Sequence, residues 1–400
     1  MNDRGFDDWG WGDETDERVR TRTLRPADRV AERAYFTQPL GTGLPVLDGE
    51  PSLVFASDNY LGLACDGRVQ KAARQAAETV GTGSGGARLA TGDTLVHHDL
   101  ERLLAETKGT ERALVFPSGY AAAVGTITAL EPDVVFSDEY NHQGILDGCR
   151  LSGAEVVTYD HCDAASLEAA LDRRAADDED GTERWLVVTA SVFGQDGTVA
   201  PLATLSELTT AFGAWIMVDE SHAAGLYAHA GGVVQATGLD DEVDIQIGTL
   251  SAAFASQGGY VAGAADLIEH LVTRAHLFGY AAGLAPPAAA AASEAVHVAR
   301  HGDCRDRLWA NVEHLRDGLH GLGYEVNGES QILAIQLAHP QRVSALVTAL
   351  RDRGVVVGTV TPADRSACGI RVTPIASHDQ DDIVACLEAF EAAGIEGGVL

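Results

Sequence analysis

Lysine is nearly absent from this chain. Lys71 and Lys108 are the only lysines among 28 lysine and arginine residues, so 26 are arginines, and they face 59 acidic residues. The formal net charge of −31 argues against nucleic acid or an anionic membrane as a partner, because both would be repelled. Self-repulsion of this size destabilises a compact state unless counterions screen it. We therefore interpret the charge as an adaptation to high salt.

Paired cysteines and long apolar runs are also missing. The six cysteines are scattered and never form C-x-x-C, which indicates neither a zinc site nor a redox pair. No basic segment followed by an apolar signal region opens the chain, and no apolar run is long enough to span a bilayer. We expect a cytoplasmic protein with buried free thiols.

What the sequence does contain is an alternation of short apolar runs and helix-period segments, beginning at about residue 66. Strands that are buried on both faces and separated by crossover helices predict an α/β fold with a mainly parallel sheet and helices on each side. One such helix is expected over residues 94–104, with Glu101 and Glu106 exposed. The predicted strands lie at residues 113–116, 134–136, 156–157, 185–188, 215–218 and 243–247.

The rhythm changes after Pro286 and Pro287, where two long helices precede three short strands. At 400 residues the chain can hold two domains. We expect a large domain over residues 60–285, a smaller α+β domain over 286–400, and a segment 21–59 that packs with the small domain. Residues 1–20 read as a flexible acidic tail, or alternatively as a peptide that docks Trp9 and Trp11 on a partner.

Several strands end in side chains that could carry chemistry, since ligands bind at the carboxyl ends of strands in such sheets. Ser118, Gly119 and Tyr120 open a helix after one strand, which makes either a phosphate cradle or a simple cap. His142 follows the next strand and is either structural or catalytic. Asp219 and His222 follow a third, where they could meet a protonated pyridine ring or form a cap with an ion pair.

Residues 248–263, GTLSAAFASQGGYVAG, form the most informative stretch. A strand, a Gly-Thr turn, a run of small residues and a second Gly-rich strand could hold a cofactor against the sheet. The stretch strongly resembles the lysine-bearing loop of the α-oxoamine synthases, which are pyridoxal-phosphate enzymes that join an amino acid to an acyl-CoA. Ala252 stands where that family has its lysine.

Further motifs match the same family in order over roughly residues 55–380. Within the family the chain looks most like the 8-amino-7-oxononanoate synthases and the glycine C-acetyltransferases. The matching segments are YLGL at residues 60–63, GTGSGGARLATGDTLVHHDLE at 81–101, SGYAA at 118–122, NH at 141–142, VFGQDG at 192–197, VDESH at 218–222 and IRVTPIASH at 370–378.

The resemblance implies a type I pyridoxal-phosphate fold with a seven-stranded-type sheet, and a homodimer whose sites form between subunits. His142 would stack on the pyridine ring, Asp219 would hold the ring nitrogen protonated, and His222 would contact the phenolic oxygen. A second set of roles concerns phosphate and substrate. The Ser118 turn and Thr249 would bind the phosphate, and Arg371, with Asn59, would bind the carboxylate of an amino-acid substrate.

The sequence departs from the family pattern at several positions of the expected cofactor and substrate site. Ala252 removes the Schiff-base lysine, and neither Lys71, on a polar helix face, nor Lys108, in a helix-ending turn, is expected to replace it. The order Asp58-Asn59 reverses the usual one and places a carboxylate where a substrate carboxylate should bind. Other polar groups of the family are replaced by small residues at Ala123, Gly144, Ala190, Gly194, Ala281 and Ala282.

Three functions remain open on these residues. The first is a catalytically silent relative with a structural or regulatory role, in a homodimer or with a lysine-bearing homologue, as in the related serine palmitoyltransferases. The second is residual activity as an 8-amino-7-oxononanoate synthase or glycine C-acetyltransferase. The third is a protein that binds an acyl-CoA or a carboxylate through Arg371. Pyridoxal 5'-phosphate is the expected cofactor, held non-covalently at most.

Overall fold

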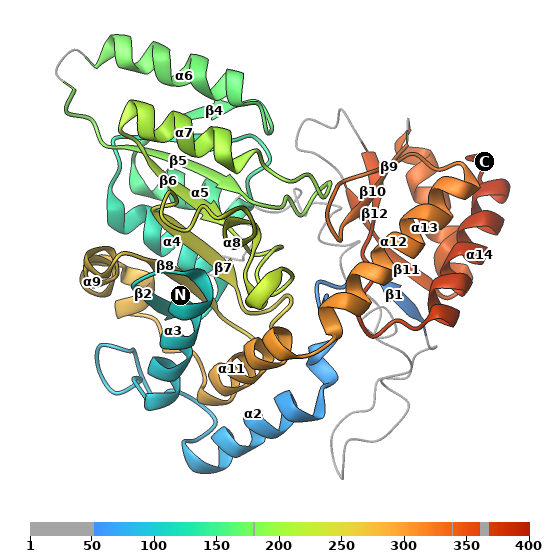
Figure 1. The fold of residues 1–400 in the computed structure, drawn as a ribbon, viewed down its shortest axis with the longest axis horizontal. Coiled ribbons are helices and arrows are strands. Elements are labelled where there is room, and N and C mark those ends of the chain that lie inside the picture. The colour runs from blue at the N-terminus through green and yellow to red at the C-terminus, as the bar shows by residue number, and fades with distance from the viewer. Residues whose placement is uncertain (1–51, 179–180, 338, 361–367) are drawn as a thin grey trace, which may run out of the picture.

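Two sheets organise the computed structural model, which describes residues 52–178, 181–337, 339–360 and 368–400 (Figure 1). The expected acidic tail, its two tryptophans and nearly all of the segment 21–59 lie outside the described residues. The long helix α11 (Pro286–His301) leads from the part that holds the larger sheet to the helix α12 (Cys304–Leu322), which covers the smaller one.

The larger sheet has seven strands and is mainly parallel, as predicted. Only β8 runs antiparallel to its neighbours, β2 and β7. The order is β2 (Arg112–Phe116), β8 (Gly259–Gly263), β7 (Ile245–Thr249), β6 (Trp215–Asp219), β5 (Trp185–Ala190), β3 (Val134–Asp138) and β4 (Glu155–Tyr159).

Helices cover both faces of this sheet because successive strand residues point to opposite sides and most are apolar. Leu114, Val135 and Met217 face one layer, formed chiefly by α4 (Gly119–Leu130), α5 (Gln143–Ser152) and α9 (Ala265–Arg274). Ala113, Val134 and Ile216 face the other. That second layer includes α3 (Leu95–Lys108), α6 (Ala164–Asp177) and α7 (Leu202–Phe212). The short helices α8 (Val233–Thr237) and α10 (His276–Gly279) follow β6 and α9 along the chain.

The smaller sheet combines the two ends of the described chain. Its order is β1 (Leu53–Phe55), β11 (Val355–Val360), β12 (Cys368–Val372), β10 (Leu333–Leu337) and β9 (Val326–Asn327). Because β1 pairs in parallel with β11, residues just before Tyr60 are fixed to the C-terminal part of the chain. The helices α13 (Pro340–Asp352) and α14 (Gln380–Glu396) complete this part, and α2 (Gly67–Thr79) packs against α11.

The structure corrects the expected exposure of Glu101. Glu101 is buried rather than exposed, because Arg88 donates two hydrogen bonds to its carboxylate and the backbone N–H of Val115 donates a third. Cys149, Cys304 and Cys386 are free and buried, as expected, whereas Cys162 is free but only half-buried. Among the described residues no helix is both long and apolar enough to cross a membrane.

Candidate active site

The candidate residues gather along one edge of the larger sheet. The carboxyl ends of its parallel strands share this edge with the beginning of β8, so the backbone register orders them. Gly259 pairs with both Phe116 and Thr249, and Asp219 pairs with both Ala190 and Ile247. Ser118, Thr249 and Asp219 therefore follow one another along the edge in the order of their strands.

Ser118 and Thr249 lie at the start of α4. The hydroxyl of Ser118 accepts a hydrogen bond from the backbone N–H of Ala121 at 3.0 Å, which makes it the helix cap. A Cβ on Gly259 would lie 2.5 Å from the backbone of Gly119, so only glycine allows this close approach. The positive end of the helix dipole and the free N–H groups at a helix start favour the binding of an anion. Tyr120 points elsewhere, since its hydroxyl donates to Asp147 at 3.0 Å.

Ala252 lies in the turn between β7 and β8, with 3 % of its surface exposed. Its carbonyl accepts from the N–H of Ala255, which has a positive φ of 51°. Hydrogen bonds between Thr249 and Ser251 and between Ser256 and the carbonyl of Ala288 hold the turn on either side. The Ala252 methyl group packs as part of the protein core.

Asp219 and Asn141 are buried polar groups at neighbouring strand ends. One carboxylate oxygen of Asp219 accepts from the N–H of Ser221 at 2.9 Å, while 8 % of the residue stays exposed. The amide nitrogen of Asn141 donates to Ser137 and Val188, and its amide oxygen has no partner among the described residues. Asp219 keeps a second carboxylate oxygen that a ligand could use, whereas the amide oxygen of Asn141 is buried.

His222 belongs to a chain of four polar side chains. Its Nδ1 is hydrogen-bonded to the Tyr60 hydroxyl at 2.7 Å. Arg371 donates to that hydroxyl at 3.0 Å and also pairs with the carboxylate of Asp58. The chain connects the end of β6 to β12 of the smaller sheet.

The environment sets the charge of each member. Burial lowers the pKa of His222 below its usual value, so the imidazole is neutral at pH 7. Burial raises the pKa of Tyr60 far above its usual value. Burial also opposes ionisation of Asp58, but the guanidinium of Arg371 outweighs it and holds the pKa of Asp58 below its usual value. Asp58 and Arg371 are thus a charged pair.

Gln331 was not predicted and joins this chain from the smaller sheet side. Its amide nitrogen donates to the carbonyl of His222 at 2.7 Å. Its amide oxygen is buried and has no partner in the described part of the chain, and the same is true of Nε of Arg371. No local sequence signal marks Gln331, because the contact joins residues 109 positions apart.

His142 caps α5 instead of pointing freely into solvent. Its Nδ1 accepts from the N–H of Gly144 at 3.0 Å, although the residue is exposed. A Cβ on Gly144 would lie 3.2 Å from that nitrogen and from the ring of Tyr120. The absence of a side chain at position 144 therefore gives the imidazole its room.

The lack of a side chain at Gly194 likewise leaves room for the imidazole of His222. A Cβ at this position would lie 2.4 Å from Nε2 of His222, far inside contact distance. The other expected positions are placed as follows. The amide oxygen of Asn59 accepts from the N–H of Ala64, and Ala282 forms a β-bridge with Ala87.

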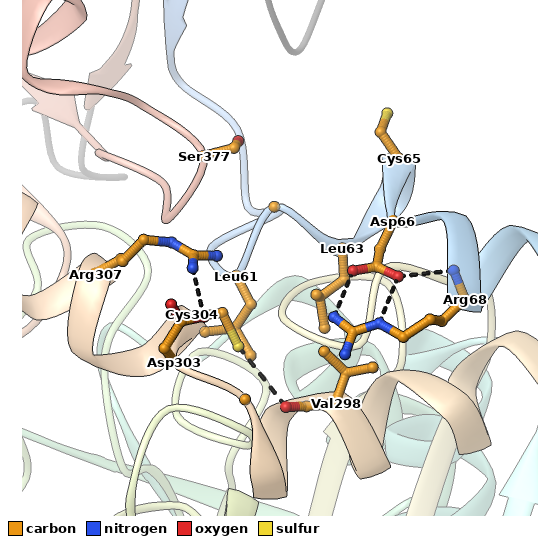
Figure 2. Close-up of a pocket in the computed structure, with 12 residues that line it drawn as sticks. Leu61, Leu63, Cys65, Asp66, Arg68, Val298, Asp303, Cys304, Arg307 and Ser377 are labelled. Carbon is orange, nitrogen blue, oxygen red and sulfur yellow. Dashed lines mark hydrogen bonds and ion pairs between the residues drawn. The ribbon is translucent and has the colours of Figure 1, made fainter.

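A cavity of about 260 Å³ lies away from this edge (Figure 2). Leu61, Leu63 and Ser377 line it together with residues where α11 meets α12. Its two arginines are already paired, Arg68 with Asp66 and Arg307 with Asp303. The cavity therefore offers no free charge to a ligand.

Solved structures of serine palmitoyltransferases share this fold. A serine palmitoyltransferase from Sphingomonas wittichii superposes with a TM-score of 0.85 at 30 % identity, covering 96 % of this chain and 98 % of that one. A lysine-to-alanine variant of the enzyme from S. paucimobilis, solved with a bound PLP–myriocin aldimine, gives a TM-score of 0.84 at 29 % identity, with 89 % and 90 % coverage.

The sequence relatives include several 8-amino-7-oxononanoate synthases. The 8-amino-7-oxononanoate synthase of Anaeromyxobacter dehalogenans is 43 % identical over 365 residues, 89 % of this chain and 90 % of the relative. That of Lysinibacillus sphaericus is 35 % identical, with 89 % and 92 % coverage. The family model for aminotransferase class I and II matches residues 50–390. The chain belongs to the aminotransferase class I and II family, in the neighbourhood of the 8-amino-7-oxononanoate synthases and serine palmitoyltransferases.

Proposed function

We propose that this chain is a degenerate α-oxoamine-synthase-like protein that is catalytically silent and has a structural or regulatory role. The ancestral activity would be the decarboxylative condensation of an amino acid with an acyl-CoA. The observation that carries the proposal is Ala252, a buried methyl group in the turn where the family has its lysine amine. That amine is both the covalent anchor and the usual proton-transfer base, each a large share of the rate.

The remaining residues fit pyridoxal phosphate as a non-covalent ligand. The N-terminus of α4 with Thr249 would hold the phosphate, and the carboxylate of Asp219 would face the ring nitrogen. Bound there, the cofactor would supply an electron-withdrawing ring for reactions at carbon beside an amine. The lysine-to-alanine serine palmitoyltransferase with its bound PLP shows that such a substitution and the cofactor coexist in a relative.

Neither of the two lysines is placed to replace the lost amine. Lys71 is exposed on α2. Lys108 is the last residue of α3 and is fully buried, with its ammonium 2.6 Å from a carboxylate oxygen of Glu220. Because these are the only lysines, no other lysine could capture the cofactor covalently.

Both imidazoles of the site are engaged within the chain, which also supports silence. His142 caps α5 and His222 is bonded to Tyr60, and glycines at positions 144 and 194 make room for these arrangements. Gly144 and Gly194 therefore do more than remove hydrogen-bonding groups. Their lack of a side chain fits the observed positions of the imidazoles of His142 and His222.

A subunit interface would give a silent chain its role, and we propose a homodimer or a heterodimer with a lysine-bearing homologue. Large apolar side chains are exposed around the Ala87–Ala282 bridge, among them Leu89 and Tyr280. A Cβ on Gly279 would lie 3.2 Å from Leu89, so the two segments are adjacent. Purification of the native complex would show which copy covers this face.

The deciding experiment is cofactor titration followed by borohydride reduction and mass spectrometry. We expect pyridoxal phosphate to bind, but to leave no covalent mass on Lys71 or Lys108 after reduction. Ala252→Lys is the positive control and should acquire the reduced cofactor at position 252. A reduced adduct on either native lysine would overturn the proposal.

A turnover assay separates silence from residual 8-amino-7-oxononanoate synthase or glycine C-acetyltransferase activity. Thiol release from acyl-CoA in the presence of L-alanine or glycine should be at least about 1,000-fold slower than in the Anaeromyxobacter relative. A rate within tenfold of that relative would contradict catalytic silence. Binding of a carboxylate through Arg371 is the less favoured alternative, because Asp58 already pairs with that guanidinium.

A further inference from the structure

The guanidinium of Arg371 is paired within this chain through one nitrogen, while its Nε is buried and has no partner in the described part of the chain. One of its nitrogens, Nη2, donates both to the carboxylate of Asp58 and to the hydroxyl of Tyr60. The Tyr60 hydroxyl is also 3.2 Å from the same oxygen of Asp58. The three side chains are hydrogen-bonded to one another, and Asp58 is the only anion among them.

Of the two side chains, Asp58 is the more exposed to solvent. The Asp58 side chain keeps 45 % of its surface exposed, whereas Arg371 keeps 18 %. An arriving carboxylate would therefore meet Asp58 before it reached the guanidinium. The carboxylate of Asp58 would repel it, and it would have to displace Asp58 from the guanidinium of Arg371.

Tethering makes such displacement harder. A group attached to the same chain competes at an effective concentration of roughly millimolar or above, without further loss of translational freedom. Asp58 is held close to Arg371 because β1 pairs with β11, and β11 pairs with the strand that carries Arg371. A free carboxylate that binds in the millimolar range is outcompeted by this built-in one.

Apart from Nε of Arg371, which is a buried donor without a partner in the described part of the chain, the remaining polar atoms around the pair favour a donor over an anion. Gln331 presents a buried amide oxygen with no partner in the described part of the chain, and Asp58 has an exposed carboxylate edge. The neutral imidazole of His222 adds no positive charge. These are acceptors for an ammonium group or another hydrogen-bond donor.

We propose that Asp58 determines ligand class at this site, by occupying Arg371 so that an amine without a carboxylate is accepted and an amino acid is rejected. The inference rests on the proposed function, since it names the ligand of the same degenerate site. It departs from the ancestral reaction, whose first substrate is an amino acid.

The test compares L-alanine with ethylamine, which is the same molecule without its carboxylate. Their dissociation constants are measured by ligand-observed saturation-transfer NMR on the full chain, with and without pyridoxal phosphate. The native chain should bind ethylamine at least as tightly as L-alanine. Asp58→Asn should strengthen L-alanine binding at least about tenfold, a gain of about 1.4 kcal/mol, and should leave ethylamine unchanged or weaker.

Two variants make the comparison specific. Adding Arg371→Gln to Asp58→Asn should abolish the gain for L-alanine. Asp133→Asn is the matched control, because Asp133 pairs with Arg184 elsewhere on the surface and its side chain is 43 % exposed. It should change neither ligand.

Each other outcome counts against the proposal. It is overturned if Asp58→Asn fails to bind L-alanine more tightly, or if both ligands gain equally, which would mean only a more open pocket. The arms without pyridoxal phosphate keep this test separate from the proposed function. Failure of the cofactor to bind would refute the anchors at α4 and Asp219 without touching the role of Asp58.

Discussion

Gly194 and His222 fit together as a glycine and an imidazole that occupies its missing side-chain space. A Cβ on Gly194 would lie 2.4 Å from Nε2 of His222, while the opposite ring nitrogen is bonded to Tyr60. The lack of a side chain at position 194 and the orientation of the histidine are therefore one structural arrangement.

Gly194→Ser should displace the imidazole of His222. The contact at 2.4 Å cannot persist, so the ring must turn and the bond to Tyr60 should break. We expect a loss of about 1–3 kcal/mol in the free energy of unfolding, as for other overpacked sites. The pKa of His222 should rise toward its usual value of about 6.5 as the ring becomes hydrated.

Urea unfolding and histidine NMR titration measure these two effects. Gly83→Ser is the control, since Gly83 is exposed and a Cβ there would meet nothing within 4 Å. An unchanged pKa of His222 in the Gly194→Ser variant would show that the two residues are not coupled.

Lys108 should be essential for stability although it has no part in the proposed chemistry. Its ammonium and the carboxylate of Glu220 are both fully buried and lie 2.6 Å apart. Lys108→Met should cost about 3–5 kcal/mol because it strands a buried carboxylate. Adding Glu220→Gln should recover part of that loss. Lys71→Met, on the exposed face of α2, should be neutral in the same thermal unfolding assay; equal effects at both lysines would refute this account.

The fold was predictable because its strands are buried on both faces. Continuous apolar runs such as the one ending at Phe116 have one interpretation when helix-period segments separate them. The carboxyl ends of parallel strands must share an edge, which placed Ser118, Asp219 and Thr249 together. The two-residue strand β9 carries too little pattern to be recognised.

Partners supplied by distant residues could not be predicted. Glu101 lies on the polar side of its helix by periodicity, yet Arg88 covers it from the preceding loop. Gln331 reaches His222 only because the smaller sheet closes on the larger part. The motif order predicted a carboxylate at Asp58 where a substrate carboxylate should bind, but its pairing with Arg371 and the matching of glycines to the two imidazoles required coordinates.

Salt should stabilise the protein strongly. With a net charge of −31 the folded state repels itself, and the Debye length falls from about 10 Å at 0.1 M to about 3 Å at 1 M salt. We expect the melting temperature to rise by at least about 5 °C between 0.1 and 2 M potassium chloride, equivalent to roughly 4 kcal/mol for a chain of this length. Sucrose at matched water activity is the control for exclusion effects. A melting temperature insensitive to potassium chloride would contradict the high-salt interpretation.

His161 should make stability fall as the pH rises above neutrality. Its two ring nitrogens face Asp138 at 3.0 Å and Asp196 at 3.3 Å, and Tyr140 stacks on the ring. Burial opposes the charge, but the two carboxylates, with the nearby Cys162 thiol, outweigh it and raise the pKa of His161 to about 12. The folded chain therefore keeps a proton that the unfolded chain releases near pH 6.5. The stabilisation is complete below about pH 6.5 and is lost progressively toward pH 12.

Urea unfolding of the native chain and of His161→Gln between pH 6.5 and 9.5 checks this sign. The variant should be less stable at pH 6.5, by about 3 kcal/mol for two charged hydrogen bonds, and the difference should shrink as the pH rises. Cys162→Ser removes the thiol as a second titrating group near the ring and should preserve the native slope. A difference that stays constant across this range would show that His161 is neutral in the folded chain and that the carboxylates hold it without a shared charge.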